Sequence, residues 1–450
     1  MKQAITIFDH LHFDNPTTEQ RLALQNMADF CKKDNNDDFM ILCGAAGTGK
    51  TSIVSAFIGY LNAMGIRYLI AAPTGRAARI LGRKSKTLSS TIHSLIYLSE
   101  VNKKTGVIHC KLKQNLNNRE TIYIIDEASM IASQPSDNVE SLFKSTNSIL
   151  QDVVTYVKSG NKRNKVLFLG DRYQLAPIGE KESKALCQTY LEKTFQWKGN
   201  TNQLTEIKRQ ENGSNIMRNA IEARKAMEQG KGHAALFSPK VRNVWAAADD
   251  YVEVFKKYGP EHAICITASH GMNKIFNTNA RERIFGRNAR SIVAGDLMIV
   301  TTNWKRNEKY LYNGDHVMVK EILLDQVEEV AGLHFVPIRV SSKSLDGKEE
   351  EIEDFLLLES IHSPNGQLGI AIENDLRAKR FATNRHFAET GSPEDDRYVG
   401  ALRLNYGYAI TCNKAQGGEW EKVYINTFKI PDLRFQYTAV TRAKQELCLY

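Results

Sequence analysis

The stretch that most constrains the fold is the glycine-rich run Gly44, Ala45, Ala46, Gly47, Thr48, Gly49, Lys50 and Thr51. It fits the P-loop pattern, in which glycines let backbone N–H groups face a phosphate chain. A short apolar run precedes it at 39–43, and apolar residues recur at helical spacing from Ile53 to Leu61. Strand, loop and helix follow in the order that places a helix N-terminus against a phosphate. The pattern predicts an α/β fold that binds a nucleoside triphosphate.

The last two side chains of this run have expected roles in the site. The Lys50 ammonium can reach the β and γ phosphates of a bound nucleotide. The Thr51 hydroxyl can hold Mg²⁺. We therefore expect a nucleoside triphosphate and Mg²⁺ to bind together.

Length and composition limit the class of protein. A chain of 450 residues should hold two or more domains, and its net charge of +9 suits a polyanion such as nucleic acid without requiring one. No apolar run approaches the roughly 20 residues that span a bilayer, and the first residues contain no hydrophobic signal core. The cysteines form no C-x-x-C pair. We expect a cytoplasmic protein with reduced thiols, no membrane association and no structural metal.

Apolar runs alternate with polar or helical stretches in two separate parts of the chain. The runs of the first part are 39–43, 68–72, 121–125 and 166–169, and those of the second part are 262–268, 423–426 and 446–450. Runs that are apolar on both faces suit parallel strands covered by helices. A helical stretch at 272–285 belongs to the second part, a hairpin-like turn lies at 100–110, and short β-like runs fill 316–399. We expect two α/β domains, each with a small insertion.

Polar residues follow two of the predicted strands of the first part. Asp126 and Glu127 follow 121–125, where an Asp can hold Mg²⁺ and a Glu can accept a proton from the attacking water. Gln174 follows 166–169, and its uncharged amide can orient water or sense a γ-phosphate. The simpler interpretations are solvated acids and a polar turn. The position of these residues after apolar strands of a P-loop chain favours function.

Two arginines stand outside these motifs. Arg209 lies in LTEIKRQ and Arg442 in YTAVTRAK. A P-loop site needs further positive charge for its transition state, which an arginine finger commonly supplies. Each arginine could equally be an ordinary surface residue.

Further segments suit a nucleic-acid track, because hydroxyl, amide and cationic groups bind phosphates without reading sequence. These segments are 72–76, 90–93 and 409–417. Tyr97, Trp304 and Trp420 could stack on bases, although core packing is the more usual role of such residues.

Taken together, the motifs resemble those of superfamily 1 DNA helicases, in the superfamily 1B branch that includes RecD-like and Dda-like enzymes. In chain order the matching segments are TTEQ around Gln20, GAAGTGKT, APTGRAARIL, STIHSL, IIDEASM, FLGDRYQLAP, LTEIKRQ, YGYAITCNKAQGGEW and YTAVTRAK. They run from about residue 17 to the last residues of the chain. Their order makes the resemblance specific.

The resemblance implies two RecA-like domains with ATP bound between them. Residues 1–200 would form domain 1A with a hairpin insertion, 1B, near 97–120. Residues 201–315 and 400–450 would form domain 2A, and 316–399 an SH3-like insertion, 2B. It also implies a monomeric motor that hydrolyses ATP, moves 5′-to-3′ on single-stranded DNA and unwinds duplex at junctions, in a bacterial or phage-infected cell.

The same resemblance assigns roles to residues. It gives Lys50, Asp126, Glu127, Gln174, Arg209 and Arg442 to catalysis, with Mg²⁺ on Thr51 and Asp126. It gives Gln20 to adenine and adds Glu419 to the nucleotide contacts. It gives to DNA the residues Pro73, Thr74, Arg76, Thr91, His93, Thr411, Asn413 and Lys414.

The chain departs from the family pattern at two places. Asn413 stands before Lys414 where relatives often have His, and 101–110 contains no aromatic residue where some relatives have one at the hairpin tip. A motor that moves on DNA or remodels protein–DNA complexes without unwinding is therefore an open alternative. A nucleotide switch that binds DNA without hydrolysis is another, which the intact P-loop and carboxylates disfavour.

Overall fold

The computed structural model describes residues 5–85, 87–105, 107–135, 147–206, 215–343, 348–366 and 368–450. Contacts among the described residues divide the chain into two compact units. The first consists of Met1–Leu98, Lys111–Asp137 and Ser145–Ser214, and the second is built on Ser99–Cys110 and Asn215–Tyr450. Each unit is described by itself.

The described part of the first unit contains a six-stranded parallel sheet in the order β3-β2-β6-β7-β1-β8. Its strands are β1 (Phe39–Gly44), β2 (Tyr68–Ala72), β3 (Ser89–Thr91), β6 (Ile122–Ile125), β7 (Lys165–Gly170) and β8 (Gly199–Leu204). β1, β6 and β7 are buried along their whole length, as their unbroken apolar runs predict. The predictions at 39–43, 68–72, 121–125 and 166–169 are confirmed. The edge strands β3 and β8 are polar, and no apolar run predicts them.

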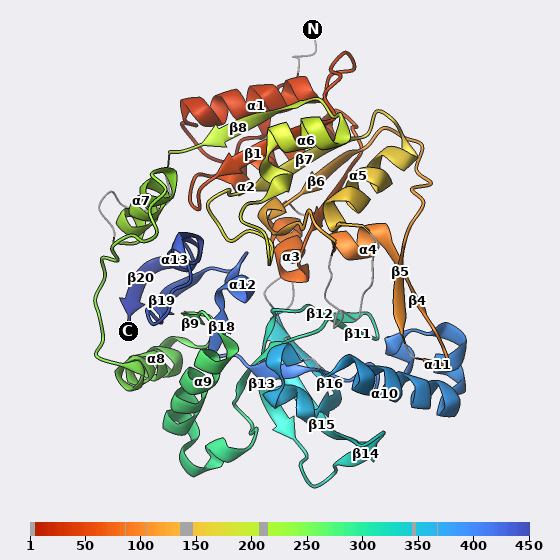
Figure 1. Cartoon of the computed structure of the whole chain (residues 1–450), viewed down its shortest axis with the longest axis vertical. Coiled ribbons are helices and arrows are strands. Elements are labelled where there is room, and N and C mark those ends of the chain that lie inside the picture. The colour runs from red at the N-terminus through yellow and green to blue at the C-terminus, as the bar shows by residue number, and fades with distance from the viewer. Residues whose placement is uncertain are drawn as a thin grey trace. The chain divides into compact units, whose positions relative to one another are not determined.

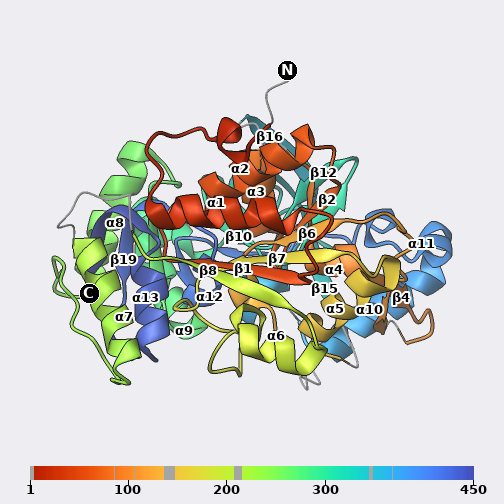
Figure 2. The same ribbon diagram turned by 90° about the horizontal axis from the view of Figure 1, so that it is seen from above.

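Helices cover both faces of this sheet. They are α1 (Thr18–Phe30), α2 (Lys50–Ala63), α3 (Gly75–Ser85), α4 (Ile92–Ile96), α5 (Ile149–Gly160) and α6 (Gln188–Phe195). Figure 2 shows α1, α2 and α3 on one side of the sheet and α5 and α6 on the other. On the first side Leu24, Met27 and Phe57 are buried with Leu42 and Leu167 of the strands. This apolar layer packs α1 and α2 against the strands.

Smaller elements complete the first unit and the hairpin. The 3-10 helices are η1 (Ile7–His10), η2 (Ala128–Met130) and η3 (Lys184–Leu186). β4 (Tyr97–Val101) pairs with β5 (Ile108–Leu112) in a two-stranded sheet at the position where the sequence predicts a hairpin. The Asn102 carboxamide accepts hydrogen bonds from the backbone of Lys104 and Thr105, at 3.0 and 3.2 Å, which closes the turn.

The second unit contains a parallel sheet in the order β18-β9-β19-β20 (Figure 1). Its elements are α7 (Asn215–Glu228), α8 (Val244–Tyr258), β9 (Ala263–Thr267), α9 (His270–Phe285), β18 (Ala409–Thr411), α12 (Cys412–Ala415), β19 (Trp420–Ile425), α13 (Leu433–Val440) and β20 (Ala443–Leu449). Tyr251 of α8 and Phe276 of α9 pack against Tyr424 on one face of this sheet. The predicted strands at 262–268, 423–426 and 446–450 and the helix at 272–285 are confirmed.

A mostly antiparallel sheet belongs to the same unit, in the order β14-β15-β13-β10-β17 with β16 also paired to β15. Its strands, the β11–β12 hairpin and the nearby helices are β10 (Leu297–Val300), β11 (Trp304–Arg306), β12 (Lys309–Leu311), β13 (His316–Ile322), β14 (Glu328–Val330), β15 (Leu333–Lys343), β16 (Glu349–Leu357), β17 (Leu404–Tyr406), α10 (Ile370–Thr383) and α11 (Arg385–Thr390). Its 3-10 helices are η4 (Gly286–Arg290), η5 (Leu358–His362), η6 (Pro364–Gly366) and η7 (Pro393–Asp395). β10 and β17 lie outside 316–399 yet pair within this sheet.

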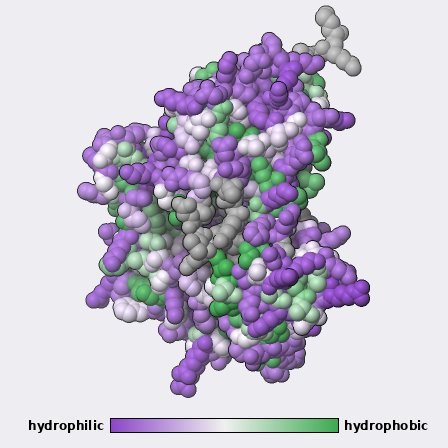
Figure 3. All heavy atoms as spheres, turned by 45° about the vertical axis from the view of Figure 1, so that its right-hand side comes forward, coloured by the Kyte–Doolittle hydropathy of each residue, from purple (hydrophilic) through white to green (hydrophobic). Residues whose placement is uncertain are grey.

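Polar side chains prevail on the face shown in Figure 3, with apolar ones scattered among them. Over the ranges that the structure describes, none of the helices combines the length and the apolar character needed to cross a bilayer.

A buried ionic cluster attaches α10 to the β-rich sheet. The Glu373 carboxylate is 2% exposed and accepts a hydrogen bond from the Arg403 guanidinium. The Arg377 guanidinium lies 3.7 Å from its other oxygen. Both arginines are themselves buried, so each charge depends on this carboxylate for compensation.

Replacing Glu373→Gln should lower the free energy of unfolding of the second unit by about 3–5 kcal/mol, because two buried guanidinium groups lose their counter-charge. Asp375→Asn is the control, since Asp375 pairs on the same helix with Lys379 at 2.7 Å but is exposed. The control should change stability by less than about 0.5 kcal/mol. Urea unfolding followed by tryptophan fluorescence measures both, and equal shifts would contradict the assignment.

Candidate functional site

The predicted nucleotide-binding residues of the first unit lie along one edge of its sheet. Because the strands are parallel, their carboxyl ends meet at the same edge. The P-loop follows β1, Gln174 follows the neighbouring strand β7, and Asp126 with Glu127 follows β6. Adjacent strands are about 4.8 Å apart, so about 10 Å separates the ends of β1 and β6. The topology thus brings the loop, the amide and the carboxylates together.

The P-loop backbone needs glycine at positions where a side chain would collide. A Cβ at Gly44 would lie 2.6 Å from the Thr48 hydroxyl and 2.9 Å from Leu204 Cβ. Gly49 has φ +84°, a left-handed conformation, and a Cβ there would lie 2.8 Å from Gln20 Nε2. Both positions are therefore closed to larger residues. The tight turn ends directly at Lys50, the first residue of α2.

Side chains fix the shape of the loop from both sides. Gln20 Nε2 donates to the Thr48 carbonyl at 2.9 Å, and its Oε1 accepts from the Thr17 N–H at 2.9 Å. The Lys50 ammonium donates to the carbonyls of Gly44 and Ala45, which places the positive charge over the loop. In this structure the Gln20 amide thus supports the P-loop, while its predicted contact with adenine stays a prediction.

The two carboxylates sit at a strained turn. Glu127 has φ 49° and ψ 39°, a left-handed conformation that is costly for a residue with a Cβ. Its N–H donates to Asp126 Oδ1 at 2.9 Å, which orients the Asp126 carboxylate. Both side chains are partly accessible, unlike the strand that precedes them. Backbone strain of this kind concentrates at functional sites, which favours a catalytic interpretation of the pair.

The end of β7 approaches the start of the P-loop. Burial raises the pKa of the Cys43 thiol to about 11, and the nearby charges of Arg172 and Lys50 oppose that rise. Gln174 lies two residues after Arg172 and is 4% exposed. From the sequence alone no role was predicted for Arg172, although the residue lies in the same segment as Gln174. That position is the signal that could have pointed to a place beside the P-loop.

Glu19 is another residue that sequence reasoning did not single out. Its carboxylate accepts hydrogen bonds from the Thr205 N–H and hydroxyl, at 2.6 and 2.5 Å, and from the Glu206 N–H at 3.3 Å. These residues follow the end of β8. One turn of α1 therefore holds both the P-loop, through Gln20, and the segment that leaves the sheet, through Glu19.

The predicted DNA-binding residues of the first unit lie at or just after the carboxyl ends of β2 and β3, at the far end of the same edge. The Thr74 hydroxyl accepts from the Ala77 N–H at 3.2 Å, and the Thr91 hydroxyl accepts from the Ser94 N–H at 3.1 Å. Pro73 and Arg76 are partly buried beside Thr74, and His93 is exposed. Both threonines thus cap local turns while they remain partly accessible, and their contacts with DNA stay predictions.

The predicted residues of the second unit lie around α12. Thr411 precedes this helix, Asn413 is exposed and Lys414 is partly buried, while Glu419 follows just before β19. Arg442 is 4% exposed, and its guanidinium donates to the carbonyls of Thr438 and Gly418 at 3.1 and 3.2 Å. Its role as a finger stays a prediction. Arg209 lies outside the described residues.

The aromatic residues considered for base stacking are buried. Tyr97, Trp304 and Trp420 are between 3% and 7% exposed. The Tyr97 hydroxyl donates to Asp152 at 2.6 Å, and the Trp304 indole donates to Asp354 at 2.6 Å. The alternative of core packing is therefore correct for all three.

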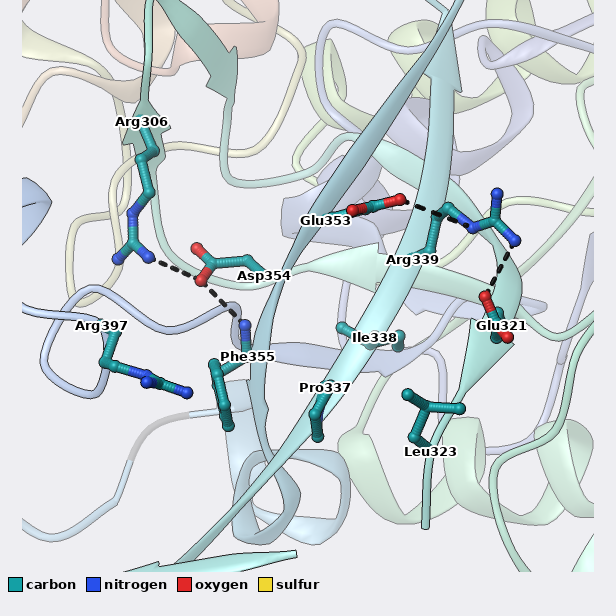
Figure 4. A pocket seen from close by; sticks show the side chains of 10 residues that line it. All are labelled: Arg306, Glu321, Leu323, Pro337, Ile338, Arg339, Glu353, Asp354, Phe355 and Arg397. Atoms are coloured by element: carbon teal, nitrogen blue, oxygen red, sulfur yellow. Dashed lines mark hydrogen bonds and ion pairs between the residues drawn. The ribbon is translucent and has the colours of Figure 1, made fainter. Parts of the chain in front are cut away.

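A cavity of about 410 Å³ in the β-rich sheet has balanced charges (Figure 4). The Arg306 guanidinium donates to Asp354 at 2.7 Å, and the Arg339 guanidinium donates to Glu321 at 2.8 Å. Arg397 stacks on the Phe355 ring, 4.1 Å from its centroid. Burial raises the pKa of Asp354, although the charge of Arg306 opposes this rise. Because the cations of this lining are paired with carboxylates, we interpret these residues as stabilising the sheet.

Comparison with known proteins gives matches in both units. The family described as an AAA domain matches residues 16–241, and the family described as a UvrD-like helicase C-terminal domain matches residues 406–450. The ATP-dependent DNA helicase dda of Enterobacteria phage T4 is 27% identical over 199 residues, 44% of this chain and 40% of that protein. The ATP-dependent RecD2 DNA helicase of Deinococcus radiodurans is 27% identical over 139 residues, 31% of this chain and 16% of that protein.

A solved structure resembles nearly the whole chain. The Pif1 helicase from Bacteroides, in complex with ADP-AlF3 and ssDNA, aligns with a TM-score of 0.53 at 16% identity. The alignment covers 97% of this chain and 92% of that one, and it supports a helicase fold of two RecA-like domains. The chain spans less than half the length of the curated relatives that it matches, between 12% and 40%.

Gly49→Ala should weaken binding of a fluorescent ATP analogue at least about tenfold, because the new Cβ collides with the amide that supports the loop. Gly65→Ala is the matched control. Gly65 also has positive φ, +65°, but nothing lies within 4 Å of its added Cβ, and it follows the other end of α2. The control should cost about 1 kcal/mol of stability and leave binding unchanged. Loss of binding in both variants would mean that backbone strain alone is responsible.

Proposed function

This chain belongs to the AAA-domain family, as a superfamily 1B helicase of the RecD, Dda and Pif1 type, and we propose that it acts as an ATP-dependent DNA helicase. The observation that carries the proposal is the shared edge of the first sheet. A P-loop, a carboxylate pair and a glutamine meet there, and residues suited to phosphate contacts follow the next strands along it. Hydrolysis and DNA binding would therefore share one rigid support.

In the proposed mechanism the first unit holds the triphosphate. The P-loop N–H groups and the Lys50 ammonium would bind the phosphates. The Thr51 hydroxyl and the Asp126 carboxylate are hard oxygen donors of the kind that Mg²⁺ prefers, so the donor set fits that ion. When bound, Mg²⁺ neutralises charge that develops on the phosphates.

Glu127 would accept a proton from the attacking water, and Gln174 would orient that water or sense the γ-phosphate. The strained turn at Glu127 supports this assignment. Arg209 and Arg442 would stabilise the transferring phosphoryl group, as the family resemblance implies. For Arg442 the supporting observation is a guanidinium that hydrogen bonds already orient within its own unit.

We further propose that both units bind single-stranded DNA. Thr74, Arg76, Thr91 and His93 would contact it from the first unit, and Thr411, Asn413 and Lys414 from the second. ATP binding and hydrolysis would then change the DNA affinities of the two units in turn, so that the protein moves along the strand in steps. Movement in the 5′-to-3′ direction and action as a monomer are part of this proposal, by resemblance.

A second candidate function is a DNA translocase that remodels protein–DNA complexes without robust unwinding. The observation that favours it is the absence of aromatic residues from 101–110, the segment that contains the β4–β5 turn. Displacement of a strand from matched duplexes with a 5′ or a 3′ single-stranded tail separates the candidates. Unwinding of the 5′-tailed duplex alone supports the helicase with its expected direction. ATP hydrolysis without displacement of either strand supports the translocase.

Glu127→Gln should reduce DNA-stimulated ATP hydrolysis about 10²–10⁴-fold, because the amide cannot accept a proton from water. Nucleotide binding should stay within a few-fold of the wild type. Glu182→Gln, an exposed carboxylate of the same unit that pairs with Lys184, is the control and should hydrolyse normally. Phosphate release with and without single-stranded DNA is the measurement, and near-normal turnover in Glu127→Gln would remove this residue from the mechanism.

Arg442→Ala should reduce hydrolysis about 10³-fold and leave nucleotide binding largely intact, because a finger acts on the transition state. Lys444→Ala, an exposed cation two residues later that pairs with Glu421 at 3.0 Å, is the control. Since Arg442 is buried, thermal unfolding of the variant is measured beside its turnover. Equal loss of binding and rate in a folded variant would exclude the finger role.

A further inference from the structure

A pocket of the second unit has a charge pattern unlike that of the cavity in Figure 4. Its volume is about 390 Å³, within the usual range of small-ligand sites. The lysines, arginines and histidines that line it come from α9, η4, η5 and α12, and they are His270, Lys274, Arg281, Arg290, His362 and Lys414. Among the described residues no carboxylate lines this pocket.

The pocket has an exposed mouth and a fixed polar floor. Lys274, Arg290 and His362 are exposed at the mouth. At the floor, the Asn277 carboxamide accepts from the Ala409 N–H at 2.7 Å and donates to the Tyr406 carbonyl at 3.2 Å. The floor is therefore part of the fold, whereas the mouth presents cations to solvent.

Arg281 fixes the position of Arg290. Its guanidinium donates to both oxygens of the buried Asp296, at 2.7 and 2.9 Å, which compensates its own charge. It also donates to the carbonyls of Ala289 and Ser291, at 2.5 and 2.6 Å. Both backbone neighbours of Arg290 are thus held by one buried group. The uncompensated positive charges of the pocket are therefore those of Lys274, Arg290 and Lys414. None of these three forms an ion pair with a described residue.

The pKa values of Lys414, His270 and His362 are all lowered, so each group loses its proton more readily than it would in water. Burial lowers the pKa of Lys414 to about 8. Burial also lowers the pKa of His270, with the charge of Lys414 adding to the effect. Burial and the charges of Lys274 and Arg281 lower the pKa of His362. An anion in the pocket would reverse these effects, because it stabilises each protonated form.

The elements packed against α12 contain no carboxylate within their own bounds that could compensate the charge of Lys414. β9 and β18 contain no charged side chain, and α13 contains Arg434, with Asp432 at its N-cap. The remaining groups that share the pocket with Lys414 are the cations named above and Tyr406 of β17. The charge around Lys414 is therefore positive.

We propose that this pocket holds a backbone phosphate of single-stranded DNA and takes up protons when the strand binds. The inference rests on the proposed function and adds a defined phosphate site beside η4 and η5, together with its regulation by pH. A phosphate group fits this pocket because its negatively charged oxygens can contact several of the cations at once. The nucleotide attached to it accounts for a volume larger than a lone anion needs.

The direction of the pH effect follows from the pKa of Lys414. A free-state pKa of about 8 means that Lys414 is mostly charged at pH 7 and mostly neutral at pH 9. A strand that binds only the charged form loses about tenfold in affinity over this interval. Lowering the pH below 7 should strengthen binding further, because the imidazoles of His270 and His362 become charged.

The test measures binding of a short fluorescein-labelled oligothymidylate to the full chain by fluorescence anisotropy, at constant ionic strength without ATP. The wild type should lose about tenfold in affinity between pH 7 and pH 9. Lys414→Arg keeps the charge but does not titrate in this range, so its affinity should change by less than about twofold between pH 7 and pH 9, whatever its absolute affinity at pH 7. Thermal unfolding confirms that the variant is folded.

A matched pair of arginines tests the location. Arg290→Gln should weaken binding several-fold at pH 7 and reduce the salt dependence by about 0.7 in the log–log slope. Arg287→Gln, on the same 3-10 helix but not among the lining residues, should match the wild type. Arg339→Gln, in the balanced cavity, should also match it.

Each outcome decides between explanations. If Lys414→Arg keeps the full pH dependence, or if Arg290→Gln loses no more affinity than Arg287→Gln, the pocket is not a DNA phosphate site. The proposed function survives that result as long as DNA stimulates ATP hydrolysis. If the oligothymidylate does not bind at all, both proposals fail. If inorganic phosphate shows the pH dependence and the oligothymidylate does not, the pocket binds free anions and the inference is overturned.

Discussion

The parallel pairing of the first sheet is the constraint on which the other features of that unit depend. Parallel strands place all their carboxyl ends at one edge, so the loops that follow them must share it. The P-loop follows β1, and the segments after β2 and β3 lie up to four strand spacings away, about 19 Å. One buried apolar layer therefore supports every functional loop of the unit. A change in that layer would alter the proposed nucleotide and DNA contacts together.

Local patterns in the sequence predicted the parts of the fold that local chemistry determines. The strands β1 and β6, and β7 after Lys165, are apolar runs, and glycines mark the turn after β1. The edge strands β3 and β8 were missed because they are polar and pair on one side only. Gln20 was identified from its motif, but its bond to the Thr48 carbonyl depends on the packing of α1 on α2. Sequence spacing contains no information about such a contact.

The cationic pocket shows the same limit more clearly. Its basic residues are spread from 270 to 414: His270, Lys274 and Arg281 recur at helical spacing on α9, whereas Arg290, His362 and Lys414 lie on three other elements. Only the fold shows that they share one volume without a carboxylate among the described residues. The cavity in Figure 4 is lined by as many carboxylates as arginines, whereas the described lining of the cationic pocket contains basic residues and no carboxylate. Electrostatic compensation, which depends on neighbours in three dimensions, distinguishes the structural cavity from the proposed binding site.

The bonds of Arg281 have a consequence for how this pocket can change through evolution. The planar guanidinium of Arg281 donates hydrogen bonds to one carboxylate and to two backbone carbonyls, a geometry that lysine cannot reproduce. Residues at the mouth make no such bonds among the described residues, and exchange between lysine and arginine there would preserve their charge. The pocket thus combines a support that depends on one arginine with a rim that tolerates exchange between lysine and arginine. Substitutions at the mouth could therefore change the strength and the pH range of the proposed anion binding without altering the fold beneath it.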